Sequence, residues 1–172
     1  MATRDIEVRF TADDSAAGTF GGCAVAYGVR DSYGSVFLPG VFAASLAQHR
    51  KAGTRPLLLW QHNPDEPIGV WEEVREDARG LAVKGRLILD TTRGREAHAL
   101  LKAGALNGLS IGFRAQTAKA LADGTRAITK AELIEISLAA FPANPAARVT
   151  GIRSTGDDLA ALFRRAAAQI RR

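Results

Sequence analysis

Short segments that alternate apolar and polar residues recur along the chain, and turn-forming residues separate them. Ile6, Val8 and Phe10 alternate with charged neighbours, and after a polar break a second apolar run follows at residues 20–27, as in an antiparallel hairpin. Alternation with a period of two is typical of a half-buried β-strand. Further strand candidates are residues 57–62, 69–74, 81–89, 106–115 and 127–141. We therefore predict a mostly antiparallel sheet that closes toward a β-barrel.

Two segments have helical rather than strand spacing. Val41, Phe42 and Leu46 recur at helical intervals up to about residue 50, and residues 91–105 carry apolar residues on one side with Gly104 near the end. Two helices among many strands do not make the regular alternation of a parallel sheet.

The length of 172 residues predicts one compact domain, which we place at residues 1–153. Residues 154–172 are predicted to form a basic amphipathic C-terminal helix, or tail. Leu159, Leu162 and Phe163 share one face there, and the tail holds four arginines against two aspartates. The chain shows no stretch long and apolar enough for a membrane span or a secretory signal, so we expect a cytoplasmic protein without membrane contact.

Composition narrows the classes of function. Hydrophobic residues make up 47% and charged residues 24% of the chain, as in ordinary globular proteins. The single cysteine, Cys23, excludes an intramolecular disulfide, and three histidines leave few ways to build a metal site. The net charge of +5 is spread thinly, without the clustered cations and aromatics of a nucleic-acid groove. We expect no metal, no cofactor and no main role in nucleic-acid binding.

Ser110 lies in a segment with a glycine two residues away on each side. If GLSIGF (108–113) is a strand, its three apolar side chains share one face, and Gly108, Ser110 and Gly112 share the other. Because the glycines carry no side chain, an extended peptide or another backbone can approach the hydroxyl closely. Two glycines also mark bends where another element packs, so the spacing alone leaves both interpretations open.

A serine hydroxyl becomes a nucleophile when a base, usually a histidine, accepts its proton. His62 ends the apolar run at residues 57–61 and precedes an Asn-Pro pair, which predicts a rigid strand end. A capped or partly buried turn histidine fits the same position. His49, near the polar end of one helix, and His98, within the other, are interpreted as surface residues.

A third group would orient the imidazole and fix its tautomer. Glu135 and Ser137 alternate with apolar neighbours, so Glu135 can face the same cleft as Ser110. A solvated strand face is the plainer explanation of this glutamate. Weaker candidates for the orienting role are Asp65, Glu66 and His98. Cys23 is interpreted as a small buried residue within an apolar strand rather than as a nucleophile.

A succession of short motifs runs through the chain. They are DSYG (31–34), LPG (38–40) with Phe42, LWQH (59–62), PIG (67–69), GL (80–81), KG (84–85), LSIGF (109–113), EISL (135–138) and FPANP (141–145). In this order, over about residues 20–150, the chain resembles the tailed-phage prohead protease family. The ordered set is far more specific than any single motif.

The resemblance implies a serine endopeptidase of capsid maturation, similar in fold to herpesvirus assemblin, with a β-barrel of about seven strands and surrounding helices. The family's histidine and serine correspond to His62 and Ser110. The herpesvirus relatives use a second histidine in the third position, where this chain offers none, so Glu135 would substitute. In those relatives a loop after that strand stabilises the oxyanion through a backbone amide and an arginine. Residues 141–148, with Arg148 as the cation, are the counterpart.

The implied substrates are the phage scaffold, or the scaffold segment of the major capsid protein, and the protease itself. Self-association is expected, inside the assembling prohead in the bacterial host's cytoplasm. Self-cleavage near residues 145–160 would release the tail. The main alternative is a non-proteolytic capsid-assembly protein with the same fold, which a fluorophosphonate probe of Ser110 separates from the enzyme. A third class, nucleic-acid binding through the basic tail, predicts a steep salt dependence of DNA affinity.

Overall fold

The computed structural model describes residues 18–152, and strands form most of that region. Two helices lie among the strands, as the spacing predicts. The elements in order are β1 (Thr19–Ala26), β2 (Ser35–Phe37), α1 (Ala43–Ala52), β3 (Leu57–Trp60), β4 (Asn63–Glu76), β5 (Gly80–Leu87), α2 (Thr92–Lys102), β6 (Gly108–Ala120), β7 (Arg126–Ala139) and β8 (Arg148–Ile152).

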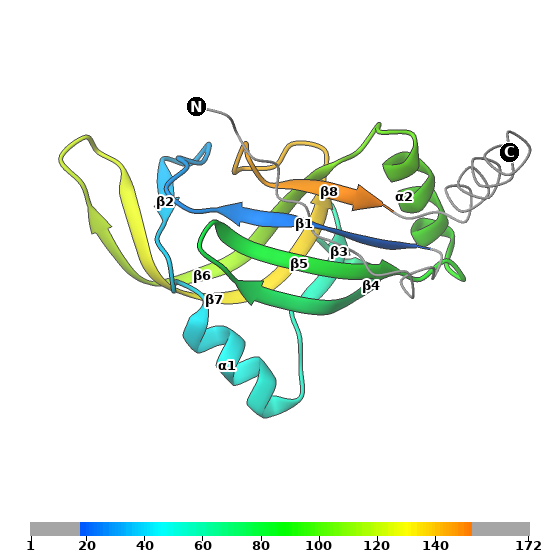
Figure 1. Ribbon diagram of the computed structural model, residues 1–172, viewed down its shortest axis with the longest axis horizontal. Helices are drawn as coiled ribbons and strands as arrows, with labels where there is room; N and C mark the ends of the chain where they lie inside the picture. The colour runs from blue at the N-terminus through cyan, green and yellow to red at the C-terminus, as the bar shows by residue number, and fades with distance from the viewer. Residues whose placement is uncertain (1–17, 153–172) are drawn as a thin grey trace, which may run out of the picture.

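Seven of the described strands close into a barrel (Figure 1). Their order around the barrel is β7-β3-β4-β5-β1-β8-β6, and β6 pairs with β7 to complete the ring. β2 adds to β7 outside this ring. β2 and β3 run parallel to β7, whereas the other pairs are antiparallel. The predicted mostly antiparallel β-barrel is confirmed.

β6 and β7 form a long pair whose two halves differ. From Gly108 to Gly112 the pair belongs to the barrel, and a register shift follows between Gly112 and Phe113. Beyond this shift the pairing continues to Ala120 and Arg126, and Figure 1 shows this half projecting from the barrel as a two-stranded ribbon. Residues 114–120 are exposed, whereas Ser110 is buried. The serine segment therefore lies in the half of the pair that belongs to the barrel.

Aromatic and branched side chains fill the barrel. The rings of Phe20 and Trp71 meet edge to face with centroids 5.4 Å apart, and Phe37 packs against both Phe42 and Phe113. Such pairs add specific geometry to the burial of apolar surface. The largest fully buried side chains belong to Phe20, Phe37, Phe42, Leu58, Ile68, Trp71, Leu81, Leu87, Leu109, Ile128, Leu133 and Ile136.

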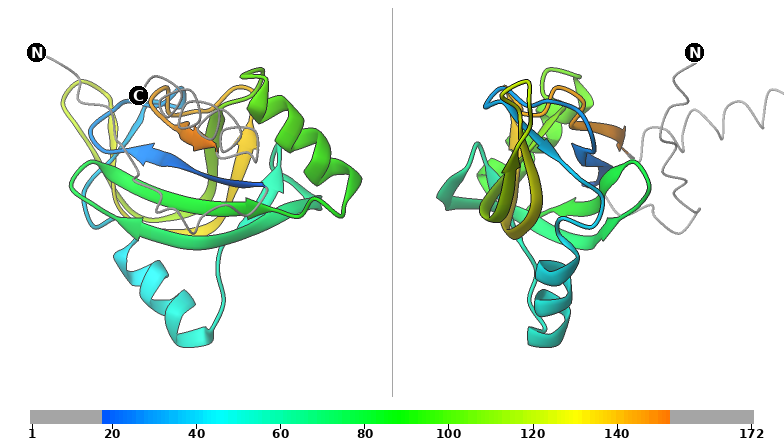
Figure 2. Two further views of the ribbon diagram at one scale, coloured as in Figure 1. Left: turned by 45° about the vertical axis from the view of Figure 1, so that its right-hand side comes forward. Right: turned by 90° about the vertical axis from the view of Figure 1, so that its left-hand side faces the viewer.

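The two helices pack at different sides of the barrel (Figure 2). α1 contacts β7 and β4, and the buried Ser45 Oγ accepts a hydrogen bond from the backbone amide of Leu133 at 3.0 Å. α2 contacts β4 and β5. It begins after Thr91, whose hydroxyl accepts a hydrogen bond from the amide of Gly94 and caps the helix. α2 therefore lies over the strand that begins just after His62.

The structure differs from the sequence-based expectation in several elements. β2 and β8 were not predicted, because each is short and follows a segment rich in turn-forming residues. Among the described strands the neighbours of β1 are β5 and β8. The strand predicted at residues 6–10 lies outside the described range, so that hairpin stays a prediction. The tail and the proposed boundary at residues 153 and 154 also lie outside it. In residues 18–152 the helices are too short or too polar to cross a membrane.

Candidate active site

His62 lies in a two-residue turn that joins β3 to β4. Trp60 pairs with Asn63 across the turn, and the φ angles of Gln61 and His62 are 51° and 63°. Positive φ at both central residues is the pattern of a type I′ hairpin turn, which normally favours asparagine and glycine. Gln61 and His62 carry a side chain each, so the conformation is strained and the surrounding contacts must hold it.

Contacts on both sides hold this turn in place. The amide of Gln61 donates to the carbonyl of Leu138 at 3.0 Å, and the Gln61 side chain accepts from the amide of Ala140. On the side of α2, the Arg93 guanidinium lies over the Trp60 ring and bonds to Glu66. Glu66 in turn accepts a hydrogen bond from the Asn63 side chain at 3.1 Å.

These contacts also test Asp65 and Glu66, the weaker candidates for the residue that orients the His62 imidazole. Glu66 is engaged with Arg93 and Asn63, and Asp65 is exposed in β4. The structure therefore provides no contact of either carboxylate with His62. It brings a different carboxylate to the histidine.

Glu135 of β7 is the acid that contacts His62. The distance from His62 Nδ1 to Glu135 Oε1 is 2.6 Å, and the Glu135 side chain is 8% exposed, against 44% for His62. This hydrogen bond, with the negative charge of the carboxylate, raises the pKa of His62 above its ordinary value, while partial burial opposes the rise. Because Nδ1 donates to Glu135, Nε2 of the neutral ring is left as the proton acceptor.

Ser137, two residues along β7, completes the contacts of this pair. Its hydroxyl donates to Glu135 Oε2 at 2.7 Å and accepts from the backbone amide of His62 at 3.1 Å. Sequence reasoning assigned it no role. The sequence does contain a signal for this contact, because the alternation of polar and apolar residues places Ser137 on the same strand face as Glu135.

Ser110 lies directly opposite Ser137 in the β6–β7 register. It is 6% exposed, and it lines a cavity of about 350 Å³ together with His62. No hydrogen bond joins Ser110 to His62 among the residues that the structure describes. In free enzymes a catalytic hydrogen bond is often long and tightens only when substrate binds. The cavity is lined by Ala24, Val25, Asp31, Ser32, Tyr33, Phe37, His62, Leu109, Ser110, Ile111, Phe113, Phe141, Ala143 and Asn144.

The two glycines that flank Ser110, at positions 108 and 112, pack against neighbouring elements. A Cβ atom on Gly112 would lie 2.3 Å from Oε1 of Glu135, its register partner. A Cβ atom on Gly108 would lie 2.2 Å from the carbonyl oxygen of Ala139 and also meet the Pro142 ring. The protein itself therefore fills the space that each glycine leaves. Of the two interpretations left open, these contacts favour the one in which another element packs there, with Gly112 against Glu135. A substrate-binding role of Gly108 and Gly112 stays a prediction.

Arg148 is the first residue of β8 and pairs with Gly108. Its guanidinium donates to the carbonyl of Ala147 at 2.9 Å, and the residue is half-buried. It is absent from the lining of the cavity, whereas Phe141, Ala143 and Asn144 of the preceding loop line it. The loop therefore borders the site, and the oxyanion role of Arg148 stays a prediction.

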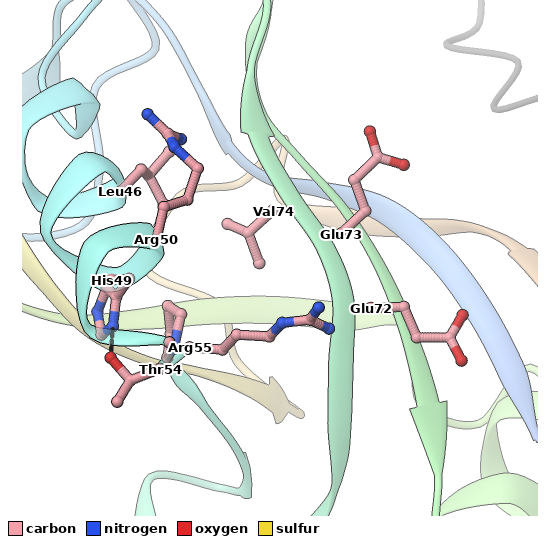
Figure 3. Close-up of a pocket in the computed structure, with 10 residues that line it drawn as sticks. Leu46, His49, Arg50, Thr54, Arg55, Glu72, Glu73 and Val74 are labelled. Atoms are coloured by element: carbon pink, nitrogen blue, oxygen red, sulfur yellow. Dashed lines mark hydrogen bonds between the residues drawn. The ribbon is translucent and has the colours of Figure 1, made fainter.

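A second cavity, of about 410 Å³, lies between α1 and β4 (Figure 3). It contains His49, which is half-buried. His49 Nδ1 bonds to the Thr54 hydroxyl at 2.9 Å, and Nε2 bonds to the Leu133 carbonyl at 3.1 Å. Figure 3 shows Arg50, Arg55, Glu72 and Glu73 around the same space. Its histidine therefore has no carboxylate partner among the described hydrogen bonds.

The remaining candidates, His98 and Cys23, line neither cavity. His98 is half-buried in α2, its Nε2 is buried without a partner in the described region, and burial lowers its pKa. Cys23 is buried, as predicted, and its thiol donates to the Val25 carbonyl, while burial raises its pKa. Within residues 18–152, no three His, Cys, Asp or Glu side chains are grouped to hold a metal ion.

The fold and this site together define a class: a β-barrel with a buried serine and a carboxylate on two neighbouring strands and a histidine in the turn beside them. Residues 4–160 match the family described as caudovirus prohead serine protease, and the chain belongs to that family.

Two relatives in sequence carry names from phage capsids. The chain is 33% identical over 154 residues to the prohead protease of Enterobacteria phage HK97, covering 87% of this chain and 66% of that protein. It is 36% identical over 104 residues to a capsid polyprotein of Pseudomonas phage PAJU2, covering 56% of this chain and 15% of that one. The chain thus spans slightly less than two thirds of the first relative and a small part of the second.

A solved structure supports the fold. The bacteriophage T4 capsid assembly protease is similar with a TM-score of 0.55 at 11% identity, over 69% of this chain and 80% of that one. At this identity the likeness concerns the arrangement of the strands alone.

Proposed function

We propose that this chain is a serine endopeptidase of phage capsid maturation. The observation that carries the proposal is the contact between His62 and the buried Glu135 at the wall of the cavity that also holds Ser110. Membership of the prohead protease family supports it. The protease would cleave its substrates inside the assembling prohead, within the bacterial host.

The geometry supports acyl transfer by a serine nucleophile. Ser110 Oγ attacks the carbonyl carbon of the scissile peptide, and His62 Nε2 accepts the hydroxyl proton. Glu135 stabilises the imidazolium, which then gives its proton to the leaving amine as the C–N bond breaks. Water, activated by the same histidine, hydrolyses the acyl ester and restores Ser110. Residues 141–148, with Arg148, are proposed to stabilise the oxyanion.

Two exposed aromatic residues support a peptide substrate. Tyr33 is 82% exposed and Phe141 is 95% exposed, yet both line the cavity. Their loops are joined by a hydrogen bond from the Ser32 amide to the Ala143 carbonyl at 2.9 Å. Large aromatics held at the rim of an apolar cavity bind side chains well, because little conformational entropy is lost. We assign them to contact with an apolar side chain of the substrate.

The proposed substrates are the scaffold, or the scaffold segment of the major capsid protein, and the protease itself. The names of the relatives support this choice, since one is a prohead protease and another is a capsid polyprotein. Self-association of the chain is proposed with it.

Coexpression with the cognate capsid protein tests the proposal. Intact masses are compared for the wild type and Ser110→Ala, which keeps the shape of the site but cannot attack a carbonyl. We expect shortened capsid protein, or shortened protease, only with the wild type. Equal masses in both cultures, while capsids assemble, would instead indicate the non-proteolytic assembly protein.

A further inference from the structure

Ser137 is buried, with 0% of its surface exposed, and its hydroxyl makes two hydrogen bonds inside the site. One goes to the carboxylate of Glu135 and the other comes from the backbone amide of His62. The side chain is absent from the lining of the cavity. Its proton is committed to Glu135, so Ser137 is not placed to react with a substrate itself.

The first hydrogen bond fixes the orientation of the carboxylate. The terminal torsion of a glutamate is broad, so a carboxylate held by one oxygen can rotate. Here Oε1 accepts from His62 and Oε2 accepts from Ser137, at 2.6 and 2.7 Å. Both oxygens are thereby held, and Oε1 stays aligned with the imidazole.

The second hydrogen bond acts on the backbone of the base. His62 has a φ of 63°, a conformation that persists only where neighbouring contacts impose it. Ser137 Oγ bonds to the amide of that same residue. A single hydroxyl therefore ties the carboxylate and the strained backbone of the histidine to one point on β7.

We propose that Ser137 is a positioning residue that holds Glu135 and His62 in the geometry needed for proton transfer. The inference rests on the proposed protease function. A displacement of about 1 Å in a reacting group can cost about 100-fold in rate, so a residue outside the reaction can govern it.

Ser137→Ala tests the inference, with Ser45→Ala as the matched control. Ser45 is also a buried serine whose hydroxyl accepts a hydrogen bond from a β7 amide, but it lies in α1 and does not line the cavity that holds Ser110. We expect Ser137→Ala to lower kcat by roughly 10- to 100-fold with little change in KM. Ser45→Ala should keep the wild-type kcat, and Ser137→Thr, which keeps the hydroxyl, should recover most of the loss. Equal kcat values in Ser137→Ala and Ser45→Ala would overturn the proposal.

An NMR titration of the His62 ring gives a readout that needs no substrate. In Ser137→Ala the freed carboxylate spends less time at Nδ1, so the pKa of His62 should fall below its value in the wild type. An unchanged or higher pKa would contradict positioning, even if the wild type cleaves nothing and the proposed function fails. If Ser137→Ala does not fold, Ser137→Cys replaces it, because the thiol is a weak donor. That variant should lower both kcat and the His62 pKa, and wild-type values for both would overturn the proposal.

Discussion

Two cavities in the described part of the protein are each lined by a histidine and a hydroxyl group. Only one of the two also brings a carboxylate to its histidine, as a catalytic site requires. Between α1 and β4, His49 contacts Thr54 and a backbone carbonyl (Figure 3). At the other cavity, His62 contacts the carboxylate of Glu135 and shares the space with Ser110. The cavity with His49 is the larger, so size does not identify the site.

The difference lies in what can balance the charge of a protonated ring. A carboxylate stabilises imidazolium, whereas the neutral carbonyl of Leu133 offers only a dipole. The backbones differ as well, because His49 lies in an ordinary helix and His62 is held in a strained turn. Strain of this kind clusters at functional sites. The chemistry of the partner, rather than the presence of a histidine and a hydroxyl, therefore separates the two regions.

Replacing the two hydroxyl groups gives the largest expected contrast. Ser110→Ala should remove cleavage, with a loss of about 10⁶ in rate as in comparable triads, while the protein stays folded. Thr54→Ala should cleave at close to the wild-type rate. Rates are measured on purified capsid protein, with thermal unfolding as the control for folding. Cleavage by Ser110→Ala near the wild-type rate would remove it from the role of nucleophile.

Replacing the two histidines sharpens the same contrast. His62→Ala should be about as damaging as Ser110→Ala, because members of one catalytic unit are not additive. His49→Ala loses two hydrogen bonds and should lower stability by about 1–3 kcal/mol, without slowing the folded protein. A double variant of Ser110 and His62 that is much slower than either single variant would indicate separate roles.

Glu135→Gln tests whether the carboxylate is what distinguishes the two histidines. The amide keeps a hydrogen bond to His62 but loses the charge, so we expect a loss of up to roughly 10⁴ in kcat, milder than that of His62→Ala. Because the carboxylate raises the pKa of His62, the wild-type ring becomes the neutral base only as the pH passes this raised value. The acid limb of kcat/KM should therefore move to lower pH in the variant. If the acid limb of the kcat/KM profile had the same midpoint in Glu135→Gln as in the wild type, a group other than Glu135 would set the pKa of His62.

The aromatic rim carries the smallest expected effect. Phe141→Ala and Tyr33→Ala should each raise KM by roughly 5- to 30-fold, equivalent to about 1–2 kcal/mol of lost contact, with kcat nearly unchanged. Leu121→Ala removes another exposed apolar residue, from the loop that joins β6 to β7, and serves as the control. Equal KM values in all three variants would show that the rim does not contact substrate.

Much of this architecture could be predicted because the strand pattern is local. The alternation around Glu135 places it on one face, and the pairing of Gly112 with Glu135 then brings that face to Ser110. The nearby β2 was missed because three residues are too few to show a period.

The turn at His62 could not be read from the sequence. Gln61 and His62 are not the residues that a type I′ turn normally favours, and contacts from β7 and α2 impose the conformation. The packing of Glu135 over Gly112 was also hidden, since it depends on the register between β6 and β7, which shifts at several points along the pair. Both features arise from tertiary structure, which overrides local propensity.

Labelling with a fluorophosphonate probe tests the central claim most directly, because the probe reacts with an activated serine hydroxyl whatever the natural substrate is. Peptide mapping of the labelled wild type should find the adduct on Ser110. The adduct should vanish in Ser110→Ala, fall strongly in His62→Ala and persist in Thr54→Ala. An adduct on any other residue, or none in a preparation that cleaves capsid protein, would contradict the assignment of Ser110 and His62 as nucleophile and base.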